Sequence, residues 1–215
     1  MNFGIIAEGV TDQVVIEEII CAYLKDSNIE INPLQPKNKI DSGGWTKVFD
    51  YCKTKEFRNA FDWLDYVIIQ LDTDAKESWP YENIPAASDG DREANIALRN
   101  RIIEIIKNSV GTEFFKKIEK KVLFAIAIES IECWILTFHA TRKAHKTKVV
   151  NCLNTLNSSY LSKLGYTIDP LAKAYDHGRH YQKASKPIKK GLNTDRKQLN
   201  TSLVLFLECI ESKCR

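Results

Sequence analysis

The sequence contains no apolar run of the ~18 residues that a membrane-spanning helix needs, so we expect no membrane span. Its opening stretch, MNFGIIAEGVTD, lacks the basic start of a secretory signal peptide and reaches an acid at Glu8. The six cysteines include no Cys-x-x-Cys pair, which argues against a structural zinc site. We therefore expect a cytoplasmic protein whose cysteines are reduced and mostly fill the core. Internal repeats and low-complexity segments are also missing.

Charge is spread unevenly along the chain. Residues 1–132 hold 16 Lys/Arg against 23 Asp/Glu, a net of −7, whereas residues 133–215 hold 15 against 5, a net of +10. An acidic part joined to a basic tail indicates an anionic partner at their junction, with nucleic acid as the first candidate. A solvated basic surface is the other interpretation of the charge alone.

Short apolar runs alternate with helical patterns along the first two thirds of the chain. Residues 3–7, 29–34, 66–71 and 121–128 are predicted strands, and residues 45–55, 91–110 and 130–139 are predicted helices, as is a segment that begins near Thr11 or Asp12. A turn is expected at 41–44. Strands that are apolar on both faces predict an α/β fold with a mainly parallel four-stranded sheet and helices on both faces.

The character of the sequence changes near residue 140. We predict a catalytic domain over residues 1–140, and a basic helical C-terminal extension over residues 141–215 that packs on it. Within the extension, residues 147–164 and 200–212 are predicted helices. The segment 173–197 is basic and has little apolar surface to bury.

Acids follow three of the predicted strands. Glu8 follows the first, Asp72 and Asp74 follow the third, and Glu129 follows the fourth. In open parallel sheets, ligands bind beyond the carboxyl ends of the strands, where the strand order reverses. These acids converge only if their strands are neighbours, which favours the strand order 2-1-3-4.

Two further acids extend this set. Asp12 lies one turn into the first helix and can lean over the same edge, and Glu132 follows Glu129 by three residues on one helix face. So many carboxylates in one place would raise one another's pKa values unless a cation neutralised them. Mg²⁺ prefers oxygen ligands, and two such ions can hold the attacking and leaving oxygens of a phosphodiester. A single acid at a strand end is more often a helix cap or a solvated group, so the prediction depends on the combination.

At this point the sequence resembles a known family. Residues 8–12 (EGVTD) resemble the EG-x-T-[E/D] signature of TOPRIM domains, in particular those of OLD-family nucleases and related small TOPRIM-like proteins of bacterial mobile elements. Residues 72–74 (DTD) match the TOPRIM DxD motif, and residues 128–136 (IESIECWIL) resemble the E-x-x-E-x-W-L-L segment of those small proteins. The resemblance covers residues 3–140, with the motifs in the same order, and it implies a Rossmann-like TOPRIM sheet.

The resemblance also implies a site for one or two Mg²⁺ or Mn²⁺ ions. Glu8 would be the general acid/base or a ligand, and the other expected ligands are Asp12, Asp72, Asp74 and Glu129 or Glu132. Asp12 stands where many members carry Glu, so a water can intervene between its shorter side chain and the metal.

Lysines in the tail are the predicted contacts to substrate. Lys183, in the segment HYQKASK, is similar to a basic residue that OLD-type nucleases carry after their acids, and it would stabilise charge in the transition state. A phosphate contact or a solvated lysine are the other interpretations. Lys183, Lys186, Lys189 and Lys190 are the predicted nucleic-acid-binding residues.

The sequence thus predicts a metal-dependent endonuclease that hydrolyses phosphodiester bonds in DNA or, less favoured, RNA. No Walker motif GxxxxGK[ST] is present, so activation by a partner ATPase or sensor protein is expected, in a phage-defence or mobile-element setting. The sequence does not decide whether the protein forms an oligomer. The alternative is a non-catalytic TOPRIM module that binds nucleic acid or regulates, although such a module gains nothing from a carboxylate cluster. A phosphoacceptor receiver domain fits less well, because it wants two acids after the first strand and one after the third.

Overall fold

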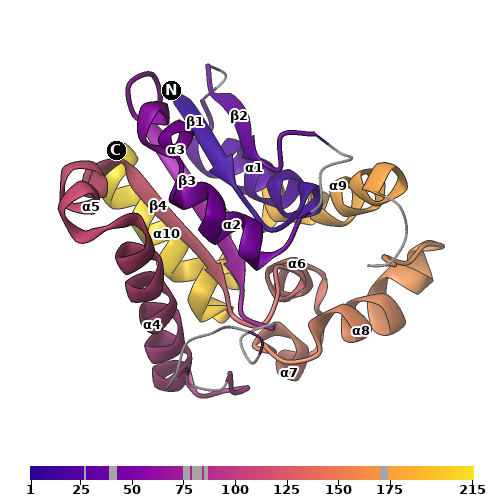
Figure 1. The fold of residues 1–215 in the computed structure, drawn as a ribbon. Helices are drawn as coiled ribbons and strands as arrows, with labels where there is room; N and C mark the ends of the chain where they lie inside the picture. The colour runs from indigo at the N-terminus through magenta and orange to yellow at the C-terminus, as the bar shows by residue number, and fades with distance from the viewer. Residues whose placement is uncertain (27, 39–42, 75–77, 79–83, 85–86, 170–173) are drawn as a thin grey trace.

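The sheet is the centre of the molecule. The computed structural model describes residues 1–26, 28–38, 43–74, 78, 84, 87–169 and 174–215. Its strands are β1 (Asn2–Ile6), β2 (Glu30–Gln35), β3 (Tyr66–Asp72) and β4 (Val122–Ala127). All pairings are parallel and the strand order is β2-β1-β3-β4, as Figure 1 shows. The predicted α/β class and the strand order 2-1-3-4 are confirmed.

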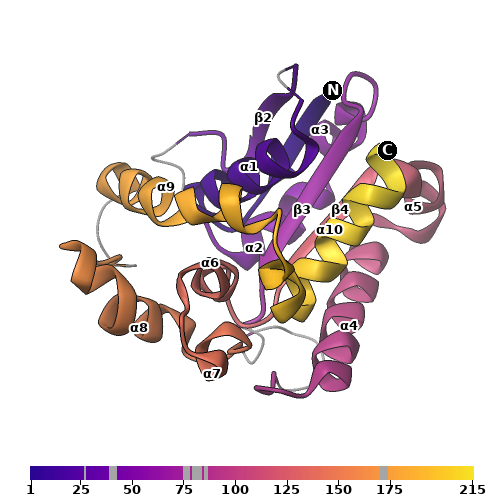
Figure 2. The ribbon, with the colours of Figure 1, turned by 180° about the vertical axis from the view of Figure 1, so that it is seen from behind.

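Helices cover both faces of this sheet, as predicted (Figures 1 and 2). On one face, Ile5, Ile68 and Leu123 pack in a core with α1 (Val10–Leu24) and α10 (Thr201–Cys214). On the other face, Ile69 and Phe124 pack in a core with α2 (Trp45–Cys52), α3 (Lys55–Ala60), α4 (Arg92–Val110) and α5 (Thr112–Ile118). Because both faces are buried, the strands are apolar throughout rather than alternating.

The C-terminal helices complete the first of these cores. α9 (Ala174–Gly191) lies against α1, and α10 lies along β4 (Figure 2). Tyr181, Ala184 and Ile188 of α9 are buried. The expectation that segment 173–197 has little apolar surface to bury is therefore wrong, because these residues recur at helical spacing within a basic sequence. Residue 173 lies outside the described residues, and the division of the chain at residue 140 stays a prediction.

The predicted helix over residues 147–164 begins later than expected. α6 (Glu132–His139) is followed by the short α7 (Lys143–Lys146), and α8 (Cys152–Leu156) then continues into a π-helical turn (Asn157–Leu161) and a 3-10 turn (Ser162–Leu164). Further 3-10 turns are Glu119–Lys121 and Asp195–Leu199. Residues 149–151 are not helical: Asn151 precedes α8 with a left-handed φ of 55°, and the N–H groups of residues 149–151 donate to the carboxylates of Asp89 and Glu129. The predicted helix over 45–55 likewise divides, since Thr54 caps α3. The first two residues of the predicted turn at 41–44 lie outside the described residues.

The cysteines depart from expectation. Cys133 of α6 and Cys152 of α8 form a disulfide, with their Cα atoms 5.0 Å apart, so the prediction that all the cysteines are reduced is wrong. Both members of the pair are buried, as is Cys52, whereas Cys21 is exposed. Within the part of the chain that the structure describes, no helix is long and apolar enough to cross a membrane.

Candidate active site

Glu8 lies just beyond the carboxyl end of β1 and is fixed by neighbouring backbone groups. Its carboxylate accepts the backbone N–H of Asp72 at 2.8 Å and also the backbone N–H of Trp45, the first residue of α2. Burial, and after it the charge of Asp74, raises the pKa of Glu8 to about 7, although the two N–H donors oppose the change. Glu8 is thus held in place and titrates near neutral pH.

Gln70 ties the ends of β1 and β3 together. This fully buried amide accepts the backbone N–H of Glu8 at 3.1 Å and donates to the Asp72 carboxylate at 2.7 Å. The sequence analysis did not single out Gln70. A polar residue inside the apolar run YVIIQL was the available signal, because a buried amide needs partners.

Two glycines allow the turn before α2 to approach the backbone of Glu8 closely. The N–H of Gly44 donates to the backbone carbonyl of Glu8 at 2.7 Å, and Gly44 has a φ of 108°. A Cβ on Gly43 would lie 1.9 Å from the same carbonyl oxygen, so a side chain is excluded there. The predicted turn at Gly43 and Gly44 thereby places the N-terminus of α2 against Glu8.

Asp12 and Asp72 lie within the same group of charges. Asp12, in the first turn of α1, is 8% exposed, and Asp72 ends β3 with some exposure to solvent. The pKa of each is raised well above its usual range. Burial is the largest cause for both, followed by Glu132 and Glu8 for Asp12, and by Asp12, Glu8, Glu132 and Asp74 for Asp72. The structure therefore brings together an acidic cluster, made up of Glu8, Asp12, Asp72, Asp74 and Glu132.

Glu132, rather than Glu129, belongs to the acidic cluster. Glu132 is the first residue of α6, is 7% exposed, and accepts a hydrogen bond from the Tyr181 hydroxyl of α9. Burial and then the Glu132 charge raise the pKa of Tyr181, so this hydroxyl keeps its proton and remains a donor. Tyr181 is a second residue that the sequence analysis missed, because the contact joins elements 49 residues apart.

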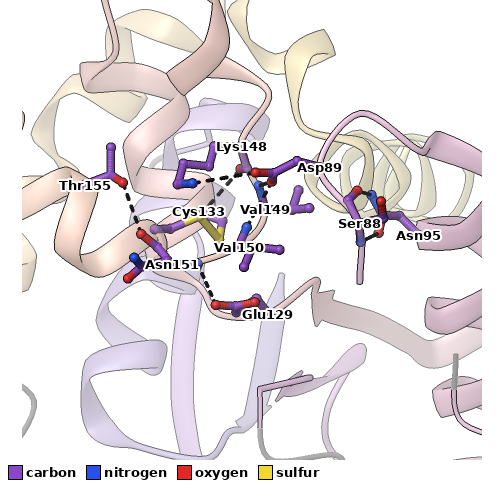
Figure 3. Close-up of polar contacts among 11 residues, drawn as sticks. Ser88, Asp89, Asn95, Glu129, Cys133, Lys148, Val149, Val150, Asn151 and Thr155 are labelled. Carbon is purple, nitrogen blue, oxygen red and sulfur yellow. Dashed lines mark hydrogen bonds and ion pairs between the residues drawn. A yellow bond between two sulfur atoms is a disulfide. The ribbon is translucent and has the colours of Figure 1, made fainter. Parts of the chain in front are cut away.

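Glu129 has a different task. Its carboxylate accepts the backbone N–H of Asn151 at 2.6 Å (Figure 3), and its backbone has a φ of 60°. Its carbonyl accepts the N–H groups of Thr73 and Asp74, so it holds the loop after β3. Glu129 is not among the charges that raise the pKa of Asp12 or Asp72. Of the two acids that the sequence left open as the expected metal ligand, Glu132 is the one that lies with the other acids; its binding of a metal stays a prediction.

Lys183 lies on a different side of α9 from Tyr181. Its ammonium sits 4.1 Å from the centroid of the Tyr166 ring. Two residues along a helix differ in direction by about 200°, so Lys183 projects away from the side chain that reaches Glu132. The structure thus does not bring Lys183 to the acidic cluster in this arrangement, and its catalytic role stays a prediction.

The other predicted lysines are also exposed on α9. Lys186 and Lys190 line a surface cavity of about 410 Å³ together with Phe138 of α6. Lys189 lies close enough to Cys21 of α1 for its charge to act on that thiol. Their nucleic-acid contact stays a prediction.

The acidic cluster has oxygen donors but not the arrangement of a formed metal site. Among the residues that the structure describes, no group of three or more His, Cys, Asp or Glu side chains is placed to hold one ion. Comparison with protein-family models, with curated proteins and with solved structures finds no match for this chain. Function must therefore be argued from the acidic cluster itself.

Proposed function

We propose that this chain is a divalent-metal-dependent nuclease that hydrolyses phosphodiester bonds in nucleic acid, DNA more than RNA, at the acidic cluster of a TOPRIM domain. One observation carries the proposal. The strongest charges acting on Asp72 are all carboxylates, namely Asp12, Glu8, Glu132 and Asp74. These acids repel one another at the end of a parallel sheet where ligands usually bind, so a cation bound there would stabilise the folded chain by neutralising them.

The donor set fits Mg²⁺ or Mn²⁺ in its chemistry. Both ions take carboxylate oxygens, and Mg²⁺ keeps several waters, so it needs few protein ligands. Asp72 and Glu132 each accept one hydrogen bond from a side chain within the protein, so each has a second carboxylate oxygen for an ion. Glu8 accepts the N–H groups of Asp72 and Trp45, and Asp74 is exposed beside them. The side chains would have to rearrange to hold an ion. A bound ion would neutralise the cluster and polarise the phosphodiester.

The chain's own residues supply positioning and proton transfer. Glu8 is the proposed general acid/base, because it lies beside Asp72 within the acidic cluster; its pKa of about 7 is that of the metal-free chain, and a bound cation would lower it. The N–H groups of Asp72 and Trp45 orient its carboxylate. Gln70 and Tyr181 hold Asp72 and Glu132 in the same way, by one hydrogen bond each.

A cleavage assay tests this proposal. Plasmid and oligonucleotide substrates would be incubated with wild type in Mg²⁺, in Mn²⁺ and in EDTA. Asp72→Asn keeps the shape of the side chain and removes its charge, so it should abolish cleavage. Asp62→Asn is the matched control, because Asp62 is exposed and lies before the amino end of β3, whereas Asp72 lies at its carboxyl end. Cleavage that survives in Asp72→Asn at the wild-type rate would overturn the proposal.

The second candidate is a binding or regulatory module without catalysis. The observation in its favour is that Glu8 accepts the N–H of Asp72 and Glu132 accepts the Tyr181 hydroxyl, so both carboxylates have partners within the protein, while no formed metal site exists among the described residues. Such a module would bind nucleic acid equally well in EDTA and in Mg²⁺ and would cut in neither.

For the nuclease, the missing Walker motif makes a partner ATPase or sensor protein part of the same proposal. We propose that it acts in the cytoplasm, in a phage-defence or mobile-element setting.

A further inference from the structure

The segment between α6 and α8 carries a concentration of positive charge that the sequence analysis did not single out. Residues 142–148 (RKAHKTK), called here the basic segment, hold Arg142, Lys143, Lys146 and Lys148 and no acid. Figures 1 and 2 show α6, α7 and α8 grouped beyond the carboxyl ends of the strands, on the side where the acidic cluster lies. We propose that the basic segment is the surface that binds the phosphodiester backbone of nucleic acid beside the acidic cluster, an inference that rests on the proposed function.

Hydrogen bonds of Glu129 join the residues around Asp74 to Asn151, which lies three residues after the basic segment. The carbonyl of Glu129 accepts the N–H groups of Thr73 and Asp74, and the carboxylate of the same Glu129 accepts the N–H of Asn151 at 2.6 Å (Figure 3). Within the basic segment, the carbonyl of Lys146 accepts the Thr137 hydroxyl of α6 at 3.2 Å. Glu129 therefore links Thr73 and Asp74 to the chain just after the basic segment.

Further contacts fix the shape of the segment. Asp89 accepts the N–H groups of Val149 and Val150 at 2.6 and 3.1 Å and pairs with the Lys148 ammonium at 3.6 Å, as Figure 3 shows. The disulfide between Cys133 and Cys152 ties α8 to α6. A surface that is ordered before binding loses less conformational entropy when a ligand arrives. The bracing thus favours a binding surface over a mobile, solvated charge run.

Three cations of the segment are available to a ligand. Arg142 and Lys143 are exposed and Lys146 is half-buried. In the described part of the chain none of the three has an ion-pair partner, whereas Lys148 pairs with Asp89. Their positive charge offsets the repulsion between the acidic cluster and a polyanion. Phosphate contacts of this kind position a nucleic acid without reading its sequence.

The lysines of α9 are less suited to this place. Lys183, Lys186 and Lys190 project about 140° to 200° around the helix from Tyr181, which faces the acidic cluster, so any contact these three make is with flanking nucleic acid. Lys189 projects only about 80° from Tyr181, but it lies two turns further along α9, near Cys21 of α1. The basic segment instead shares the edge of the sheet with the acids.

The test is a binding measurement that does not require cleavage. A fluorescein-labelled DNA oligonucleotide, single-stranded and duplex, would be titrated in EDTA with wild type and with the triple variant Arg142→Ala/Lys143→Ala/Lys146→Ala, over a range of salt. The matched control is Lys116→Ala/Lys117→Ala/Lys120→Ala, which removes the same charge from exposed positions near the amino end of β4. Circular dichroism and thermal unfolding would show that each variant is folded.

Three lost phosphate contacts should lower the log–log salt slope on duplex DNA by about 2.7, at ~0.9 per contact. If the effect vanishes near 1 M salt, that slope corresponds to about a 100-fold loss of affinity near 0.15 M. The control should keep the wild-type affinity and slope.

Wild-type affinity and slope in the triple variant would overturn this inference, and so would an equal loss in the control. The outcome is separable from that of the proposed function. If wild type cuts DNA and the triple variant binds DNA as tightly as wild type, the inference alone is overturned. If the triple variant loses DNA binding and wild type never cuts DNA, the proposed nuclease alone is overturned.

Discussion

Raising the pH of the metal-free protein from about 5 to about 8 should lower its free energy of unfolding, because the folded state holds acids that resist ionisation. Glu8 has a usual pKa of 4.5 and a pKa of about 7 in the folded chain. A difference of about 2.5 pH units corresponds to about 3 kcal/mol, at ~1.4 kcal/mol per unit. Asp12 and Asp72 act in the same direction, since the pKa of each is also raised.

The sign follows from proton binding. Between pH 4.5 and about 7 the folded state holds a proton on Glu8 that the unfolded state has released. Stability is therefore fully present below the unfolded pKa, falls as the pH rises through this window, and levels off above the folded pKa. The trend is opposite to that of a salt-bridged carboxylate.

Glu8→Gln isolates the contribution of this residue. Gln keeps one oxygen that can accept the N–H of Asp72, and it carries no charge at any pH. In EDTA, urea unfolding of Glu8→Gln should show a gain of up to about 3 kcal/mol over wild type near pH 8 and little difference near pH 4.5. Glu113→Gln is the control: Glu113 is exposed on α5 and pairs only with the exposed Lys116, so its loss should change stability by no more than ~0.5 kcal/mol at either pH. A wild type whose stability is flat over this window, or a Glu8→Gln variant no more stable than wild type near pH 8, would refute the reasoning.

Three further predictions follow from the same structure. Mg²⁺ or Mn²⁺ should raise the Tm of wild type near neutral pH by relieving the repulsion, and should leave the Tm of Asp72→Asn unchanged in differential scanning fluorimetry. Gln70→Leu should lower the free energy of unfolding by about 1–3 kcal/mol and reduce cleavage, because it leaves the N–H of Glu8 unpaired; urea unfolding within 0.5 kcal/mol of wild type would count against the bridge. Cys133→Ser/Cys152→Ser should cost about 3 kcal/mol, since the disulfide closes a loop with a sequence separation of 19, and an equal loss on reduction of wild type would confirm the origin.

The sheet was predictable because its signals are local. Each strand is a short apolar run, and the acids at the ends of β1 and β3 require those strands to be neighbours, which gives the order that the structure has. Glu8, Asp12 and Asp72 were found for the same reason, since each follows a strand or opens a helix. Glu132 was found only as an alternative to Glu129, because their spacing predicted one shared helix face; that prediction is wrong, since α6 begins at Glu132 and Glu129 has a φ of 60°.

What escaped prediction depends on contacts between distant residues. Asp89 lies 60 residues before Val149, and Glu129 lies 22 residues before Asn151, yet their carboxylates accept the N–H groups of these two residues in the chain before α8. The disulfide between Cys133 and Cys152 depends on how α6 and α8 pack, which no Cys-x-x-Cys spacing announces. The buried face of α9 was hidden because its apolar residues alternate with lysines.

The central claim is that the acidic cluster holds the divalent ion. Crystals grown or soaked with Mn²⁺ would test it through an anomalous difference map. The account predicts a peak within about 2.0–2.6 Å of a carboxylate oxygen of Asp72 and of at least one other member of the acidic cluster, with no peak in Asp72→Asn. A map without a peak at the cluster in wild type, while the protein still cuts DNA in Mn²⁺, would contradict the claim.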